Sequence, residues 1–121
     1  MNLEEFKKFR EKMNEKILEN GTLNTKRFFN LDTNVYKKGV LDEKTKELLG
    51  LVASMVLRCD DCITYHMIRC VEHGVSDEEF FEVFDVALIV GGSIVIPHLR
   101  RAVNTLHEIR EMQKDGKSVS L

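Results

Sequence analysis

Two cysteines and a histidine stand close together near the middle of the chain, in the order Cys59, Cys62 and His66. Residues four apart on a helix lie on the same face, so His66 would sit one turn beyond Cys62, where an imidazole can act as a base or as an ion-pair partner. Cys59 would lie near the first turn of this helix, where backbone N–H groups and the helix dipole stabilise a thiolate. A second thiol two residues away can attack whatever forms on the first. The stretch therefore predicts reversible disulfide chemistry.

The same residue types also allow a zinc site. Zinc binds Cys-x-x-Cys pairs, and His66, Cys70 or His73 could be recruited to such a pair. Zinc is the weaker interpretation, because Cys59, Cys62 and His66 supply only three ligands and the other two side chains lie one and two turns further along the helix. Cys70 is expected to be a small buried hydrophobic residue, since free cysteine is usually interior.

An acidic residue, Glu47, stands twelve positions before the first cysteine and directly before the apolar stretch of residues 48–57. A carboxylate at the border of a buried stretch is a candidate proton acceptor. With this acid included, the pattern resembles the carboxymuconolactone decarboxylase superfamily, specifically its alkylhydroperoxidase D-like (AhpD-like) branch, through four polar residues: Glu47, Cys59, Cys62 and His66. The resemblance continues through residues 73–76 and the glycine-containing apolar run 87–97, and covers roughly residues 41–106.

This resemblance implies a thiol-dependent (alkyl hydro)peroxidase or disulfide oxidoreductase in antioxidant defence. A hydroperoxide would oxidise Cys62 to a sulfenic acid, Cys59 would condense with it to a disulfide, and an external thiol or dithiol reductant would reopen the bond. Glu47 and His66 would pass protons, directly or through water, and no cofactor would be required. The resemblance also implies an AhpD-like helical domain with a central antiparallel helix hairpin, assembled as a homotrimer or homohexamer.

Two alternatives remain open. One is the cofactor-free lyase activity of the same superfamily on a carboxylated lactone from aromatic degradation, although the decarboxylase branch lacks the Cys-x-x-Cys pair. The other is a non-enzymatic helical assembly or a zinc-stabilised helical module. The chain also departs from the best-known AhpD-like members, which resemble Cys-Ser-His-Cys between the cysteines, because Asp61 replaces the spacer histidine of their relay. Asp60 and Asp61 favour a helix N-terminus but, as anions, oppose ionisation of a neighbouring thiol.

Size and charge exclude several classes of protein. A chain of 121 residues and 14.0 kDa is one domain, in which residues 1–40 would form an N-terminal helical extension. A net charge of −2 with dispersed basic residues argues against nucleic acid binding. The charged N-terminus lacks the apolar core of a signal peptide and no apolar run approaches the ~20 residues of a membrane span, so a cytoplasmic protein is expected. Three cysteines do not match an even, disulfide-stapled secreted framework.

The elements that must position these residues are expected to be all α, with about five to six helices. Apolar spacing predicts helices over residues 3–19, 42–58, 60–73 and 77–90. Several boundaries carry the usual signals: an N-cap at Asp42, a left-handed end at Gly74, and a capping box between Ser76 and Glu79.

Two segments are harder to assign. In residues 22–40, Asp32 and Thr33 could cap a short helix that runs through Lys38 and stops at Gly39. The last helix, which ends near residue 114 or 115, begins either at Pro97 or at Ser93 with a kink at the proline. Near its start, His98 is expected to be a surface histidine next to solvated arginines, Arg100 and Arg101.

Overall fold

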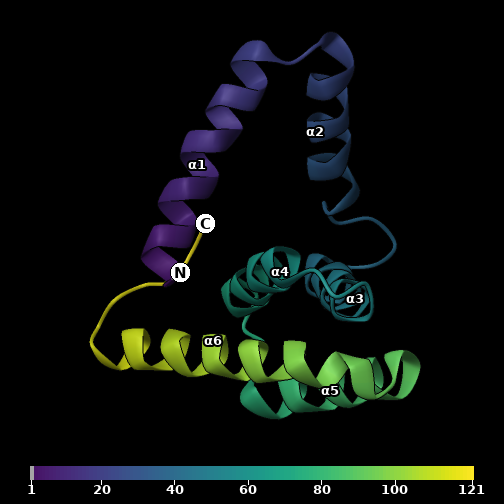
Figure 1. Ribbon diagram of the computed structural model, residues 1–121, viewed down its shortest axis with the longest axis vertical. Coiled ribbons are helices and arrows are strands. Elements are labelled where there is room, and N and C mark those ends of the chain that lie inside the picture. The colour runs from purple at the N-terminus through teal and green to yellow at the C-terminus, as the bar shows by residue number, and fades with distance from the viewer. Residues whose placement is uncertain (1) are drawn as a thin grey trace. The chain divides into compact units, whose positions relative to one another are not determined.

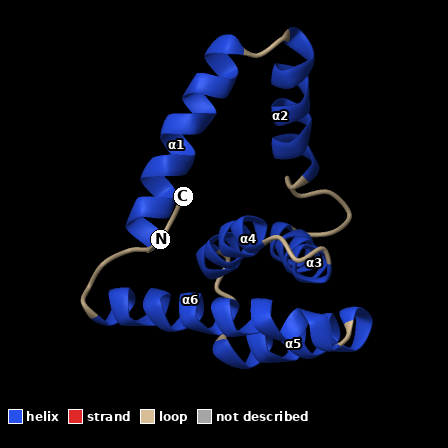
Figure 2. Ribbon diagram, in the orientation of Figure 1, coloured by secondary structure: helices blue, strands red, loops and turns tan. Residues whose placement is uncertain are grey.

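The computed structural model describes residues 2–121, which form helices and no strands (Figure 2). The elements in chain order are α1 (Leu3–Asn20), α2 (Leu23–Val35), α3 (Glu43–Val56), α4 (Asp60–Glu72), α5 (Asp77–Gly91), the 3₁₀ helix η1 (Ser93–Val95) and α6 (Ile96–Lys114). The predicted all-α fold is confirmed. The chain divides into two compact units, the first ending at Val40 and the second beginning at Leu41. None of the described helices is long and apolar enough to cross a membrane.

The first unit holds α1 and α2, and its second helix differs from the expectation. The short helix predicted after Asp32 is wrong, because α2 begins after Thr22. Thr22 and Thr25 form a reciprocal capping box in which each hydroxyl accepts the backbone N–H of the other residue. Thr33 is instead inside the helix, where its hydroxyl donates to the carbonyl of Phe29 one turn earlier. A box built from two threonines lacks the glutamate or glutamine that usually marks such a cap in a sequence.

The second unit is built on the α3–α4 hairpin. In Figure 1, α3 and α4 are seen nearly end-on and side by side, with α5 and α6 running across them. α3 packs against α4 and α5, while α4 also packs against α6. The core between these helices consists mainly of fully buried apolar side chains, among them Leu51, Met55, Met67, Phe80, Phe84 and Ala87. The expected central helix hairpin is therefore present and forms one side of the core.

The turn between α3 and α4 fixes the position of the first cysteine. Arg58 adopts a left-handed conformation with φ 60°, a place usually taken by glycine. Its N–H donates to the carbonyl of Met55, and the N–H of Cys59 donates to the carbonyl of Ser54. This pair of bonds is a Schellman motif, and α4 begins one residue later, at Asp60. Cys59 thus ends the cap of one helix and is itself the N-cap of the next.

The other predicted cap signals are confirmed, although the helix predicted to run to Arg58 ends at Val56. The side chain of Asp42 caps α3, Gly74 has φ 76° after α4, and both bonds of the capping box between Ser76 and Glu79 are present. Of the two starts considered for the last helix, the one near Pro97 is correct, since α6 begins at Ile96 with the proline in its first turn. A proline there removes an N–H that would lack a helical partner anyway.

Candidate active site

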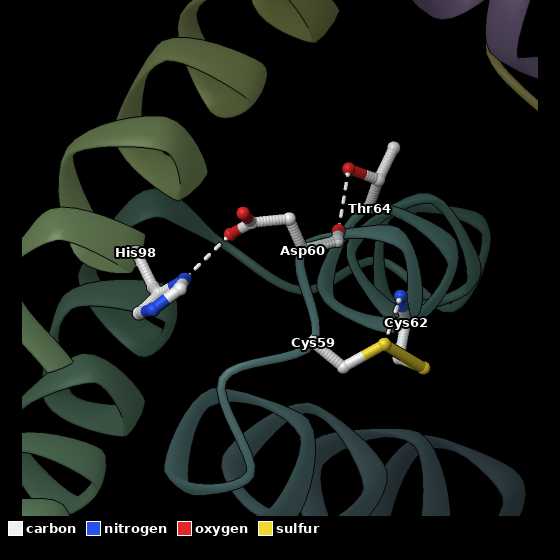
Figure 3. The surroundings of a disulfide bond; sticks show 5 residues. All are labelled: Cys59, Asp60, Cys62, Thr64 and His98. Atoms are coloured by element: carbon white, nitrogen blue, oxygen red, sulfur yellow. Dashed lines mark hydrogen bonds and ion pairs between the residues drawn. A yellow bond between two sulfur atoms is a disulfide. The ribbon is translucent and has the colours of Figure 1, made fainter.

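The two cysteines of the motif lie at disulfide-bonding distance. Their sulfur atoms are bonded and their Cα atoms are 5.3 Å apart (Figure 3). Cys59 is half-buried and Cys62 is exposed. As the N-cap of α4, Cys59 places its Sγ 3.3 Å from the backbone N of Cys62, which donates to it. In the reduced protein the same N–H group and the helix dipole would favour a thiolate at this position.

Glu47 and His66, the two residues to which the family resemblance assigns proton transfer, are in direct contact. Glu47 Oε2 on α3 lies 2.8 Å from His66 Nδ1 on α4. Glu47 is 0% exposed and His66 is also buried. A buried carboxylate bonded to one imidazole nitrogen fixes the orientation of the ring. Because His66 follows Cys62 by one turn of α4, this pair is positioned next to the exposed cysteine of the motif.

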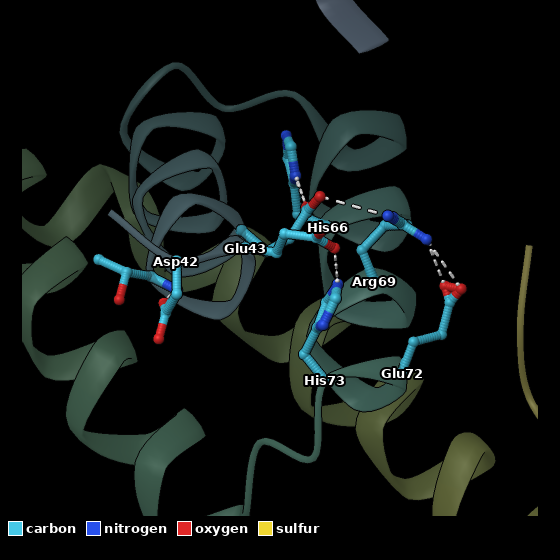
Figure 4. A network of polar contacts seen from close by, with 8 residues as sticks. Asp42, Glu43, His66, Arg69, Glu72 and His73 are labelled. Atoms are coloured by element: carbon cyan, nitrogen blue, oxygen red, sulfur yellow. Dashed lines mark hydrogen bonds and ion pairs between the residues drawn. The ribbon is translucent and has the colours of Figure 1, made fainter. Parts of the chain in front are cut away.

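Arg69 is a functional candidate that the spacing argument missed. Its Nε lies 3.5 Å from Glu47 Oε1, and its Nη1 donates to both carboxylate oxygens of Glu72 at 3.1 and 2.9 Å (Figure 4). Burial acts to lower the pKa of Arg69, but the charges of Glu72 and Glu47 and the hydrogen bond to Glu72 outweigh it and raise the pKa. A buried carboxylate needs compensating charge, and Arg69 supplies it. Its position three residues after His66, on the same helix face, was the signal that could have found it.

A further ion pair extends this row of polar contacts between α3 and α4. His73 Nε2, at the end of α4, lies 3.5 Å from Glu43 Oε2 at the start of α3 (Figure 4). Early residues of α3 thus meet late residues of α4, since Glu43 faces His73 and Glu47 faces His66. This register is that of an antiparallel pair, as predicted for the hairpin.

Cys70 is structural, as expected. It is free, fully buried and part of the core. Burial, with smaller contributions from the charges of Glu47 and Glu79, raises the pKa of the Cys70 thiol to about 12. A thiol that stays protonated is a poor nucleophile and a poor metal ligand.

The geometry gives little support to the zinc interpretation. Within residues 2–121, no group of three or more His, Cys, Asp or Glu side chains is arranged to hold a metal ion. Of the ligands considered for zinc besides the two motif cysteines, His66 and His73 pair with Glu47 and Glu43, and Cys70 is buried in the core.

The expectation for His98 is wrong. His98 Nδ1 lies 2.8 Å from Asp60 Oδ1, its side chain is 16% exposed, and Arg101 Nη1 pairs with the other oxygen of the same carboxylate. Both basic side chains belong to α6, and Asp60 is the first residue of α4. Figure 3 shows the contact of His98 with Asp60. Contacts across 38 and 41 residues follow from the packing of α6 on α4, which has no local signal in the sequence.

Comparison with known proteins shows the family of the chain. A model of the carboxymuconolactone decarboxylase family matches residues 23–105. The chain belongs to this family. The resemblance inferred from Glu47 and the Cys-x-x-Cys-x-x-x-His spacing is thereby confirmed.

Several relatives have known structures or sequences. A crystal structure of a family member from Thermotoga maritima, with a suggested role in antioxidative response, is 67% identical; it covers 97% of this chain and 99% of its own, with a TM-score of 0.93. A family member from Legionella pneumophila, solved in its apo form, is 28% identical over 86% of each chain, with a TM-score of 0.64. "Uncharacterized protein 4 in cox locus" from Paracoccus denitrificans is 29% identical over 68% of this chain and 74% of its own length.

Proposed function

We propose that this family member is a thiol-dependent peroxidase that reduces organic hydroperoxides through the Cys59–Cys62 pair. The observation that carries the proposal is the buried Glu47–His66 pair, with its atoms 2.8 Å apart, one helical turn from the exposed Cys62. A pair of this kind provides a proton acceptor beside a thiol that can form a disulfide with its neighbour.

In the first step, His66 accepts the proton of the Cys62 thiol, and the thiolate attacks the terminal oxygen of the hydroperoxide. The O–O bond breaks as the S–O bond forms. Cys62 loses two electrons and becomes a sulfenic acid, while the departing alkoxide takes the proton from His66 and leaves as an alcohol. Glu47 acts through His66: its carboxylate holds the ring and stabilises the imidazolium between the two proton transfers.

In the second step, the sulfur of Cys59 attacks the sulfenic acid of Cys62. The S–S bond forms, and the hydroxyl group leaves as water with the proton of the Cys59 thiol. An external dithiol then reduces the disulfide: its two thiols become a disulfide, and the protein regains two thiols. Such a cycle suits a reducing compartment, so we expect the protein to act in the cytoplasm.

The antioxidative role suggested for the Thermotoga maritima relative supports this proposal. The lyase alternative has less support, because it gives no use to a Cys59–Cys62 pair at disulfide-bonding distance. A proton acceptor alone would serve a lyase, whereas the adjacent thiol pair adds the oxidation chemistry.

The direct test follows the thiols through one turnover. Protein reduced with dithiothreitol, and then freed of it, is mixed with one equivalent of tert-butyl hydroperoxide. We expect the loss of two thiols and a Cys59–Cys62 disulfide in a tryptic map, with Cys70 unchanged. In the Cys59→Ser variant the sulfenic acid should persist and be trapped by dimedone on Cys62.

The control is Cys62→Ser, which keeps Cys59 and should form no adduct. Retention of all three thiols by the wild-type protein after peroxide would contradict the proposed function. If dimedone labelled Cys59 in the Cys62→Ser variant and left Cys62 of the Cys59→Ser variant unlabelled, Cys59 would be the oxidised cysteine and Cys62 the one that forms the disulfide with it.

A further inference from the structure

Asp60, which lies between the two cysteines, is held by two basic side chains of α6. Its Oδ1 is 2.8 Å from His98 Nδ1, and its Oδ2 pairs with Arg101 Nη1. In Figure 3 the carboxylate turns towards His98, while the side chain of Cys59 leads to the disulfide on the other side of the turn. These contacts, here called the Asp60 clamp, tie the first turn of α4 to the first turns of α6.

In the clamp, the negative charge of Asp60 is compensated by basic side chains. Burial acts to raise the pKa of Asp60, but hydrogen bonds and charges from His98 and Arg101 outweigh it and lower the pKa. Asp60 is therefore an anion at neutral pH. Arg101 stays protonated at any pH of interest, so at least one full positive charge opposes it.

We propose that the Asp60 clamp sets the dithiol–disulfide equilibrium of the Cys59–Cys62 pair by neutralising the anion next to Cys59. Asp60, His98 and Arg101 are positioning residues, because they act on the cysteines only through the charge of Asp60. The inference rests on the proposed function only in taking the cysteine pair to cycle between its reduced and oxidised forms.

The physical basis is the charge of the reduced state. Above neutral pH the reduced pair carries thiolate character, which a disulfide lacks. An uncompensated carboxylate on the residue after Cys59 would disfavour the thiolate and shift the equilibrium towards the disulfide. The guanidinium of Arg101 without the Asp60 carboxylate would favour the thiolate and shift the equilibrium towards the dithiol. For unit charges several ångströms apart near the surface, each effect should amount to about three- to tenfold in the equilibrium constant.

A purely mechanical clamp makes a different prediction. Asp60→Asn and Arg101→Gln each remove the same ion pair, so a mechanical role would move the equilibrium in one direction for both. Electrostatic control moves it in opposite directions. The two substitutions together restore charge balance without restoring the contact, which separates the two explanations further.

The experiment equilibrates the full chain at pH 8 with mixtures of reduced and oxidised dithiothreitol, followed by acid quench, alkylation and mass spectrometry. Two electrons and two protons pass from the dithiol reagent to the Cys59–Cys62 disulfide. We expect Asp60→Asn to favour the dithiol by about three- to tenfold and Arg101→Gln to favour the disulfide by about two- to fivefold. The double variant should lie within about twofold of wild type, and 1 M NaCl should shrink all differences.

Two control variants separate the effect of the Arg101 charge from any effect on folding. Arg100→Gln removes an equal charge from the exposed neighbour of Arg101, and should change the equilibrium by less than about twofold. Arg101→Lys retains the charge and should behave like wild type if charge is what matters. Circular dichroism confirms that each variant is folded, and if Asp60→Asn is not, the comparison of Arg101→Gln with Arg101→Lys decides alone.

Shifts of Asp60→Asn and Arg101→Gln in the same direction would overturn the inference, as would equal shifts in Arg101→Gln and Arg101→Lys. The measurement uses no hydroperoxide. A wild-type protein that equilibrates with dithiothreitol but ignores hydroperoxide would therefore refute the proposed function and leave this inference standing.

Discussion

At the scale of single residues, the contact between Glu47 and His66 separates this site from an ordinary cysteine pair. A carboxylate with 0% exposure is costly to keep charged unless it is paired, and it is paired here with both His66 and Arg69. The packing of the core thus holds Glu47 and His66 in place. The result is an imidazole with a fixed orientation, one helical turn from Cys62.

Substitution of either partner should slow the thiol reaction without unfolding the protein. We expect Glu47→Gln and His66→Ala each to reduce the rate of hydroperoxide-dependent thiol loss by about 10²- to 10⁴-fold. Because the two residues act as one unit, the double variant should be little slower than the worse single variant. Stopped-flow measurement at pH 7 tests this, with His107→Ala as a control on an exposed histidine. Unchanged rates in both single variants would make the pair structural.

Cys70 should not react with thiol reagents in the folded protein. Reduced native protein at pH 8 is expected to expose two thiols to a thiol reagent, and a third only after denaturation, because Cys70 is fully buried. Its folded-state pKa of about 12 lies above the ordinary value of 9.0. The unfolded chain therefore loses this proton first, so the contribution of Cys70 to stability is complete below pH 9 and is lost as pH rises towards 12. Urea denaturation across this range measures the effect, and three reactive native thiols would contradict the assignment.

At the scale of elements, local signals predicted α3, α4 and α5 because their caps follow common patterns. Asp42, Gly74 and the Ser76 box each depend on residues no more than three or four apart. The family pattern singled out Glu47 and His66 as residues, but their contact emerged only from the structure. The Asp60 clamp was not predictable, since it depends on how α6 lies on α4. The start of α2 was missed because its capping box uses a second threonine.

The capping box of α5 should contribute measurably to stability. Ser76→Ala removes the hydroxyl that accepts the N–H of Glu79 at 3.1 Å. We expect a loss of about 1 kcal/mol in the free energy of unfolding, as is typical for such caps. Urea denaturation gives the value, and Ser93→Ala, at an exposed serine that caps no helix, should change it by less than about 0.5 kcal/mol. Equal losses in both variants would show that the box is not the cause.

At the scale of the whole molecule, large apolar side chains of the second unit lie open to solvent. They include Leu57 at 77%, Ile89 at 85%, Val90 at 65% and Ile94 at 55% exposure. Proteins that work as monomers rarely leave such residues uncovered in numbers. We therefore propose that copies of these surfaces cover one another in an assembly, which the family resemblance implies is a homotrimer or a homohexamer.

Light scattering at micromolar concentration tests this assembly. A multiple of three 14.0 kDa chains is expected for the wild type. Ile89→Asp should shift the mass to smaller species, because it places a charge on an apolar surface that the assembly would bury. Asn104→Asp, which adds the same charge at an exposed position of α6, should leave the mass unchanged. A wild-type mass of one chain would contradict the assembly.

Peroxidase activity is tested most directly by steady-state consumption of tert-butyl hydroperoxide with dithiothreitol as the reductant. We expect turnover by the wild-type protein and by Cys70→Ala, and a fall to the rate without protein in Cys62→Ser. Consumption at the wild-type rate by a variant that lacks both Cys59 and Cys62 would contradict the proposed function.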